Sequence, residues 1–151
     1  MSDKSIFPED FFNGSINAKS KEDIPMLYDY LIDISNGHVI LDEYGRATIV
    51  SGLDAIICQA YRKIFTKQGF FNIYTRTYGS KLYQLLGKGK VFADDFSYQF
   101  LSECLVDNKY VTKITNFETN FNGSIYTIDF MMETIYGKTP FHIQDVPITY
   151  D

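Results

Sequence analysis

The chain has 151 residues, of which 45% are hydrophobic and 17% aromatic, and this composition predicts one folded domain with a substantial core. Its formal net charge is −5 and its Lys and Arg residues are scattered, which disfavours binding to nucleic acid through phosphates. No apolar run is long enough to span a bilayer, and the N-terminus lacks a signal-peptide pattern. We therefore expect no membrane association and a cytoplasmic protein, unless it leaves the cell within a larger particle.

The two ends of the chain are predicted to be extended arms around a domain of residues 26–137. Residues 1–25 show no hydrophobic period. They favour docking, on the domain or on a partner, because they contain Phe7, Phe11 and Phe12. Residues 138–151 have a strand-like composition but contain Pro147, which an arm or an edge strand tolerates and a central strand does not.

The first part of the domain is predicted to be rich in strands. Met26–Ile34 alternates imperfectly between apolar and acidic residues, so it fits a strand or a short helix. Residues 38–42 and 47–50 are β-branched runs on either side of Gly45, which supplies the positive φ of a tight turn. This pattern predicts a hairpin.

The next segment carries the clearest helix signal in the chain. Ser51 and Asp54 fit the S-x-x-D pattern of a capping box, and Gly69 fits a C-terminal cap. Between them, apolar residues recur at helical spacing and form one stripe, namely Ile56, Ile57, Ala60, Tyr61, Ile64 and Phe65.

A second helix is predicted to begin near Asp94 and Asp95, because the dipole at the start of a helix favours anions. It runs to about Val106, with an apolar side made of Phe96, Phe100, Leu101, Cys104 and Leu105. Cys58 and Cys104 both fall on or beside apolar helix faces. We expect two small buried side chains there and no disulfide framework.

Between the two helices, the apolar, strand-like run Phe70–Tyr74 precedes a lone cation, Arg76. Tyr78–Gly79 predicts a bend, and Ser80–Leu86 predicts a short helix. Two interpretations of Arg76 remain open. It is a surface arginine whose stem lies on apolar neighbours, or it is offered to a carboxylate or carbonyl on this chain or another.

Two long strands, residues 111–121 and 124–136, are predicted to be joined at Asn122–Gly123, a strong hairpin signal. A two-residue loop would place Phe121 opposite Ser124, Phe117 opposite Ile128 and Thr115 opposite Phe130. One face then collects the apolar residues Val111, Phe117, Phe121, Tyr126, Ile128, Phe130 and Met132. The other face is mainly polar, and Ile114 lies on it opposite Met131.

These elements predict an α+β fold, with a small antiparallel β-sheet, two to three helices packed on one face, and extended N- and C-terminal arms. The second face of the sheet would meet solvent. The long hairpin would leave a strand edge available for strand addition.

The sequence offers little that would support catalysis. His38 and His142 have no second His or Cys at a metal-ligand spacing, and no phosphate loop or nucleophile motif occurs, so we expect no metal, cofactor or small-molecule ligand. Glu118 and Asp129 would be diagonal neighbours in the hairpin, about 7–8 Å apart, which suits a glycosidase pair. They lie on the solvated face, where nothing raises the pKa of a general acid.

The string Ile73-Tyr74-Thr75-Arg76-Thr77-Tyr78-Gly79, followed by Leu82, is the most specific motif in the chain. It stands within an ordered series of hairpin, helix, second helix and a long hairpin that ends at Tyr136-Gly137. Across residues 38–137 this series resembles the baseplate wedge family of contractile phage tails, often labelled "lysozyme-like", and in particular its XkdS-like Gram-positive branch. That branch serves myophages and phage-tail-like bacteriocins.

The resemblance implies a structural, non-enzymatic protein of the inner baseplate, present in six copies. Its partners would be the baseplate wedge proteins, the sheath protein and the tail tube, and it would initiate sheath assembly by strand exchange. It would be assembled in the bacterial cytoplasm and released in a virion or bacteriocin particle. In the broader family a Glu-Pro-Arg motif contacts the wedge. Arg76 matches its arginine, whereas Tyr74 and Thr75 replace the other two residues.

From this resemblance we expect the wedge contact at Tyr74, Arg76, Tyr78 and Gly79. We expect sheath strand exchange at Ile125, Thr127, Asp129, Met131 and Glu133. Two other functions stay open, a cell-wall hydrolase of the tail that uses Glu118 with Asp129 or Glu103, and a cytoplasmic binding domain unrelated to phage.

Overall fold

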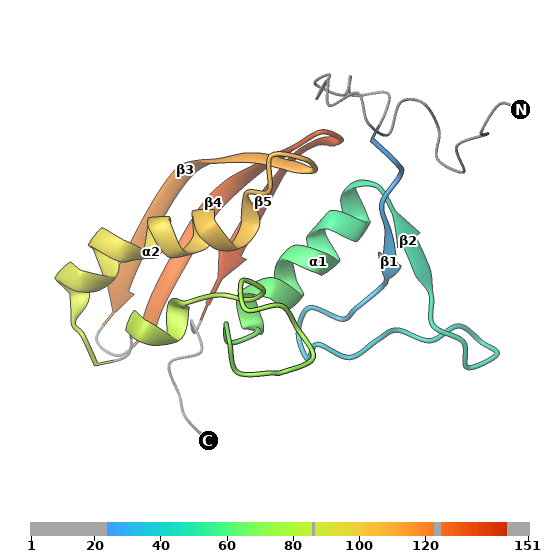
Figure 1. Cartoon of the computed structure of the whole chain (residues 1–151), viewed down its shortest axis with the longest axis horizontal. Coiled ribbons are helices and arrows are strands. Elements are labelled where there is room, and N and C mark those ends of the chain that lie inside the picture. The colour runs from blue at the N-terminus through green and yellow to red at the C-terminus, as the bar shows by residue number, and fades with distance from the viewer. Residues whose placement is uncertain (1–23, 86, 123–124, 145–151) are drawn as a thin grey trace, which may run out of the picture.

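The computed structural model describes residues 24–85, 87–122 and 125–144. Two antiparallel sheets, two α-helices and one short 3-10 helix make up these residues (Figure 1). The predicted α+β class is confirmed, although the strands divide into two sheets where the sequence predicted one. Residues 1–23 of the predicted N-terminal arm lie outside the described residues.

A two-stranded sheet stands at one end of the molecule, formed by β1 (Tyr28–Tyr30) and β2 (Ile49–Ser51) (Figure 1). Of the two alternatives for Met26–Ile34, the strand is therefore the correct one over Tyr28–Tyr30. The predicted hairpin turn is confirmed by a hydrogen bond of 2.7 Å from the Asp42 N–H to the Arg46 carbonyl. Gly45 has the positive φ that this turn requires, 75°.

Helix α1 (Leu53–Phe65) carries the predicted apolar stripe, and both of its predicted caps are wrong. Gly52 is the N-cap residue, with φ 62° and no side-chain capping bond, because Ser51 is taken up by β2 and pairs with Tyr28. The helix ends before Gly69. Thr66 is already extended, and its carbonyl accepts a hydrogen bond of 2.8 Å from the Ser80 N–H.

Helix α2 (Lys90–Leu105) begins earlier than the acidic pair predicted. Its N-cap residue is Gly89, with φ 83°, and Asp94 lies in the second turn. The Asp94 carboxylate accepts hydrogen bonds from Thr119 (2.9 Å) and Tyr126 (3.0 Å) across the interface with the sheet. The short helix predicted over Ser80–Leu86 is a 3-10 helix, η3 (Leu82–Leu85).

The larger sheet has the strand order β3-β4-β5, with β3 (Val111–Asn122), β4 (Ile125–Thr134) and β5 (Gly137–Ile143). Residues 138–143 were predicted to begin a C-terminal arm, and in the structure they form most of β5. Phe141 pairs with Phe130 of β4, and the two rings stack at 5.4 Å. Pro140 fits because β5 is an edge strand among the described residues.

The register of β3 and β4 near the hairpin tip differs from the prediction. Phe121 pairs with Tyr126, and Asn122 lies in β3 opposite Ile125. The proposed loop at Asn122–Gly123 is therefore wrong at its first residue. Gly123 and Ser124 lie outside the described residues.

Further along β3, irregular pairing between Thr115 and Glu118 changes the register again. Asn116 has a positive φ of 51° within this irregularity, as expected for an extra residue in a strand. The shift pairs Ile114 with Met132 and buries both side chains. The placement of Ile114 on the polar face was therefore wrong, because a shift of one residue moves a side chain to the other face.

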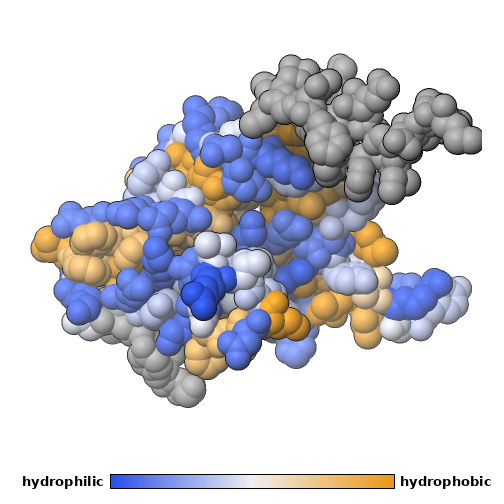
Figure 2. Space-filling view, viewed as in Figure 1, coloured by the Kyte–Doolittle hydropathy of each residue, from blue (hydrophilic) through white to orange (hydrophobic). Residues whose placement is uncertain are grey.

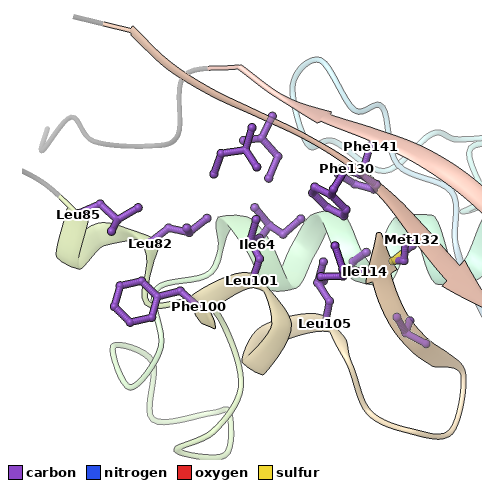
Figure 3. Packing of buried hydrophobic residues seen from close by; sticks show 14 of the residues in the cluster. Ile64, Leu82, Leu85, Phe100, Leu101, Leu105, Ile114, Phe130, Met132 and Phe141 are labelled. Atoms are coloured by element: carbon purple, nitrogen blue, oxygen red, sulfur yellow. The ribbon is translucent and has the colours of Figure 1, made fainter. Parts of the chain in front are cut away.

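One face of the larger sheet carries the main core, and α1, η3 and α2 cover that face (Figure 3). Side chains from the helices, such as Ile64 and Leu101, meet Ile128, Phe130 and Met132 of β4. All five are almost fully buried, which accounts for much of the apolar area that stabilises the fold. The opposite face of the sheet alternates with the core face and carries mainly exposed residues.

Candidate partner-docking site

Residues 66–80 form a closed loop between α1 and η3. The predicted strand Phe70–Tyr74 is absent from this part of the described chain, which consists of turns. At the base of the loop, the Gln68 N–H donates to the Ser80 carbonyl at 3.0 Å, and the buried Ser80 hydroxyl donates to the Ile64 carbonyl at 2.7 Å. These bonds join the two ends of the loop and attach it to α1. The residues between them are thus held on the surface as a unit.

Gly79 is required at the base of this loop. Its φ is +101°, and a Cβ atom there would lie 2.5 Å from the Thr66 carbonyl oxygen. Any other residue would combine a strained backbone with a clash against main-chain atoms. Gly79 is buried, so the structure gives this predicted site residue a role in shaping the loop.

Four rings form an aromatic cluster on the loop, Phe70, Phe71, Tyr74 and Tyr78. Adjacent ring centroids lie 4.9 Å, 6.3 Å and 4.3 Å apart along this order, and Tyr74 stacks on Tyr78 at an angle of 19°. Phe70 is 64% exposed and the neighbouring Ile73 is 86% exposed. Figure 2 shows hydrophobic surface at the lower edge of the molecule, where this loop lies. A large apolar group left in contact with water is typical of an interaction site.

Arg76 lies between the two stacked tyrosines in sequence, and its side chain is exposed. Within the described residues it makes neither a hydrogen bond nor an ion pair.

Burial raises the pKa of Tyr78, and the nearby Arg62 and Asp29 also shift this pKa, in opposite directions. Arg62 and Asp29 form an ion pair of 2.5 Å beside the loop, which the sequence analysis missed. Nothing local in the sequence pointed to it, since the pair joins α1 to β1.

The five residues predicted for sheath strand exchange, Ile125, Thr127, Asp129, Met131 and Glu133, lie on one face of β4, opposite the helices. However, β4 is the central strand of its sheet. From Ile128 to Thr134 its backbone is paired on both sides, so it has no open edge there. Among the described residues, β3 and β5 are the edge strands of this sheet, and β4 lacks a partner on the β5 side only at Ile125–Thr127.

On the face of the larger sheet opposite the helices, here called the open face, charged side chains are arranged in cross-strand rows. Glu133 lies between Lys138 (3.1 Å) and Lys113 (3.4 Å), and these cations, Lys138 above all, lower its pKa. The Asp129 carboxylate is hydrogen-bonded to the His142 imidazole of β5. The open face is therefore a polar, ordered surface.

The carboxylates considered for hydrolysis do not have the environment of a general acid. Glu118 is directly opposite Asp129, so the predicted diagonal placement is wrong, and both are exposed. Glu103 bonds to Lys81 at 2.9 Å, and this bond, with one from Gln99, lowers its pKa. A glycosidase acid needs a raised pKa, so Glu103 is shifted in the opposite direction.

Metal ligands and thiols were also candidates. In the part of the chain that the structure describes, no three His, Cys, Asp or Glu side chains are grouped to hold a metal ion. Cys58 is buried, as predicted, whereas Cys104 is only half-buried, and both are free thiols. No helix among the described residues is long and apolar enough to cross a bilayer.

A family model for the contractile injection system sheath initiator matches residues 28–137, which is more than half of the chain. The chain belongs to this sheath initiator family. Among curated proteins it is similar to XkdS of the phage-like element PBSX from Bacillus subtilis (strain 168). The two are 25% identical over 112 residues, which cover 72% of this chain and 74% of XkdS. Membership in the family confirms the resemblance and contradicts the alternative of a binding domain unrelated to contractile tails.

The region shared with other sheath initiators runs from β1 to the first residue of β5. It therefore includes the closed loop, both α-helices and the β3-β4 hairpin. As a sheath initiator, the protein is a component of a contractile injection particle and associates with its sheath.

Proposed function

We propose that this sheath initiator links the baseplate wedge to the sheath around the tail tube, in six copies per particle. It has a purely structural, non-enzymatic role. It is assembled in the bacterial cytoplasm and leaves in the baseplate of a virion or bacteriocin. The observation that supports this proposal is the closed loop, which exposes an aromatic cluster and Arg76 on a rigid base.

The wedge contact is formed by Tyr74, Arg76 and Tyr78, and Gly79 sets the shape of the loop beneath them. The stacked tyrosines supply apolar area at little cost in side-chain entropy. Arg76 is exposed and has no counterion among the described residues, so it is available for a bidentate bond to a carboxylate or carbonyl of the wedge. Tyr and Arg are enriched among the residues that dominate interface energies.

The substitution Arg76→Ala in a particle-producing strain tests this contact. We expect the yield of intact contractile particles, counted by electron microscopy, to fall at least about tenfold, because each particle needs this contact at several positions around the tube. The purified variant should keep its thermal unfolding midpoint, because the exposed Arg76 makes no hydrogen bond or ion pair with the described residues. A normal particle yield would exclude a central role for Arg76.

Arg46→Ala is the matched control for that experiment. Arg46 is also an exposed arginine, 73% accessible, and its ion pair with Asp42 lies at the tip of the first hairpin. We expect this variant to assemble particles normally. An equal loss with both variants would indicate a general need for positive charge and would contradict a specific contact at Arg76.

The sheath contact uses the outer edge of β3. Strand exchange needs a row of unpaired backbone donors and acceptors. Because β4 is the central strand, most of its backbone is already paired, and an edge strand fits this contact better. β3 is the longer edge, and its sequence contains no proline, whereas Pro140 removes a donor from β5.

Hydrogen–deuterium exchange of the protein, free and in complex with its sheath subunit, tests which edge is used. We expect new protection of those amides in Val111–Asn122 that do not bond to β4. Protection confined to Gly137–Ile143 would assign the contact to β5, and protection of neither strand would exclude strand exchange.

A further inference from the structure

Positive charge is concentrated in the part of the chain that contains the closed loop. Residues 62–90 hold seven of the 14 Lys and Arg residues and none of the 19 Asp and Glu residues. This segment therefore carries a charge of +7, and the rest of the chain carries −12, which together give the net −5. The net charge of −5 alone does not show this separation of positive from negative charge along the chain.

Several of these cations are neutralised by carboxylates from other elements. Arg62 pairs with Asp29, Lys81 with Glu103, and Lys90 with Asp94. These pairs lie at the sides of the segment, on α1, before η3 and on α2.

Arg76 is different, because it forms no ion pair with any residue in the described ranges. Lys67 lies over the rings of Phe70 (5.4 Å) and Tyr83 (4.6 Å), so it adds positive charge beside the aromatic cluster. The surface of the closed loop thus combines exposed rings with positive charge. A protein partner that complements both properties must carry apolar side chains and carboxylates.

Aromatic rings and cations are also typical of surfaces that bind single-stranded nucleic acid. In that mode each base stacks on the face of a ring. Here Tyr74 and Tyr78 stack on each other at 4.3 Å, so each covers a face of the other. The charge of −12 on the rest of the chain would also repel a long polyanion, whereas a short acidic segment needs only local attraction.

From these observations we propose that the closed loop binds an acidic amphipathic segment of its partner, with apolar side chains on the aromatic cluster and a carboxylate on Arg76. The inference rests on the proposed wedge contact and adds the chemistry of the segment that the wedge presents. Arg76 takes the carboxylate through its guanidinium fork, while Phe70, Phe71 and Ile73 cover the apolar side chains.

Binding of two designed helical peptides to the full-length protein tests this chemistry. Both have Leu and Tyr on one face; the polar face carries Glu in one peptide and Lys in the other. By fluorescence anisotropy, we expect the Glu peptide to bind at least about tenfold more tightly than the Lys peptide, which corresponds to about 1.4 kcal/mol. Its affinity should fall when the salt concentration is raised from about 0.05 to about 0.5 M. Equal binding, or no binding of either peptide, would overturn the proposal.

Charge reversal at one position identifies the contact. Arg76→Glu should abolish the preference for the Glu peptide and improve binding of the Lys peptide. Lys88→Glu is the matched control, because Lys88 is an exposed cation of the same segment outside the closed loop, and it should keep the preference. A preference that survives Arg76→Glu would overturn the assignment.

A third probe, single-stranded DNA, addresses the alternative. Tighter binding of the DNA than of the Glu peptide would overturn the proposal in favour of a nucleic-acid surface.

The peptide experiment and the particle experiment can fail independently of each other. If Arg76→Ala blocks assembly and the peptides show no charge preference, the wedge contact stands and its chemistry is wrong. If the preference is found and assembly is normal, the acidic ligand is right and the wedge is not its source.

Discussion

Arg62 of α1 donates to the Asp29 carboxylate of β1 across 2.5 Å, and its guanidinium also donates to the Tyr30 carbonyl at 3.3 Å. The Asp29 side chain is only 9% exposed, and its second oxygen is buried without a hydrogen-bond partner among the described residues. This ion pair attaches the two-stranded sheet to α1. Two-stranded sheets have little stability alone, so the attachment matters for the sheet itself.

Arg62→Met should lower the free energy of unfolding by about 1–3 kcal/mol, because it leaves a buried carboxylate without its counterion. Urea denaturation followed by circular dichroism measures the change. Arg46→Met is the control, since its pair with Asp42 is exposed, and it should cost less than about 1 kcal/mol. Similar losses in the two variants would show that burial of Asp29 has no special effect.

Gly79→Ala should destabilise the protein by about 2 kcal/mol or more, because the new Cβ meets the Thr66 carbonyl oxygen and the backbone has φ +101°. Gly69→Ala separates the two causes. Gly69 also has a positive φ, 75°, but nothing lies within 4 Å of its added Cβ, so we expect a loss of about 1 kcal/mol. Thermal unfolding of both variants measures the difference. Equal losses would refute the argument from the clash.

Asp94 should make folding sensitive to acid. Its hydrogen bond from Thr119, with further bonds from Lys90 and Tyr126, lowers its pKa in the folded protein. A carboxyl group with a lowered folded pKa stabilises the fold above its unfolded pKa of about 3.9, and this stabilisation is lost as pH falls through the folded pKa. Asp94→Asn should therefore be less stable at neutral pH and lose less stability below about pH 4.

Urea denaturation at a series of pH values measures this dependence. Asp95→Asn is the control, because Asp95 is exposed on the same helix and makes no hydrogen bond or ion pair with the described residues. We expect that variant to follow the wild-type curve. An Asp94→Asn curve parallel to that of the wild type down to about pH 2 would contradict the assignment.

Cys104 should be unreactive in the folded protein. Burial raises the pKa of its thiol to about 12, and the nearby Lys63 only partly opposes this effect. Because the thiolate is the nucleophile, alkylation by iodoacetamide at about pH 8 should be more than about 100-fold slower in the native than in the denatured protein. Mass spectrometry of proteolytic peptides separates Cys104 from Cys58. Alkylation of Cys104 at the denatured rate would show that it is accessible.

The sequence predicted those parts of the fold that depend on local patterns. The stripe that includes Ile56, Ala60 and Ile64 follows the helical period, and the structure buries all three in the core. The start of α2 could not be found in this way. The Asp94 carboxylate accepts hydrogen bonds from Thr119 and Tyr126, which lie on other elements. Only the folded structure shows that Asp94 is not a residue of the first turn.

The strand β5 was missed for a related reason. Gly137 and Pro140 are residues that commonly end a strand, and here Gly137 begins β5 while Pro140 lies inside it. An edge strand tolerates proline, and whether a strand lies at an edge is a property of the whole sheet. The irregular pairing of β3 near Asn116 could not be predicted either, because counting residue pairs from the turn assumes regular pairing along the whole hairpin.

In the candidate site, too, local sequence patterns were predicted and contacts between distant elements were not. The motif with Tyr74, Arg76 and Tyr78 was found from the sequence, and its placement in a strand-like run was wrong. The Arg62–Asp29 pair beside it was not predictable, because it depends on how β1 lies against α1. The central position of β4 was also unknown, and three of the residues expected to exchange strands with the sheath, Asp129, Met131 and Glu133, lie between two paired strands.

The closed ends of the loop over residues 66–80 have a consequence for how such proteins diversify. The bonds that hold it use Thr66, Gln68 and Ser80, while the residues that reach solvent stand between them. Substitutions at Phe70, Ile73 or Arg76 would therefore leave the helices and the sheet unchanged. Under the proposed wedge contact, these side chains can change together with the neighbouring protein while the scaffold is retained, so the parts of two related particles become incompatible.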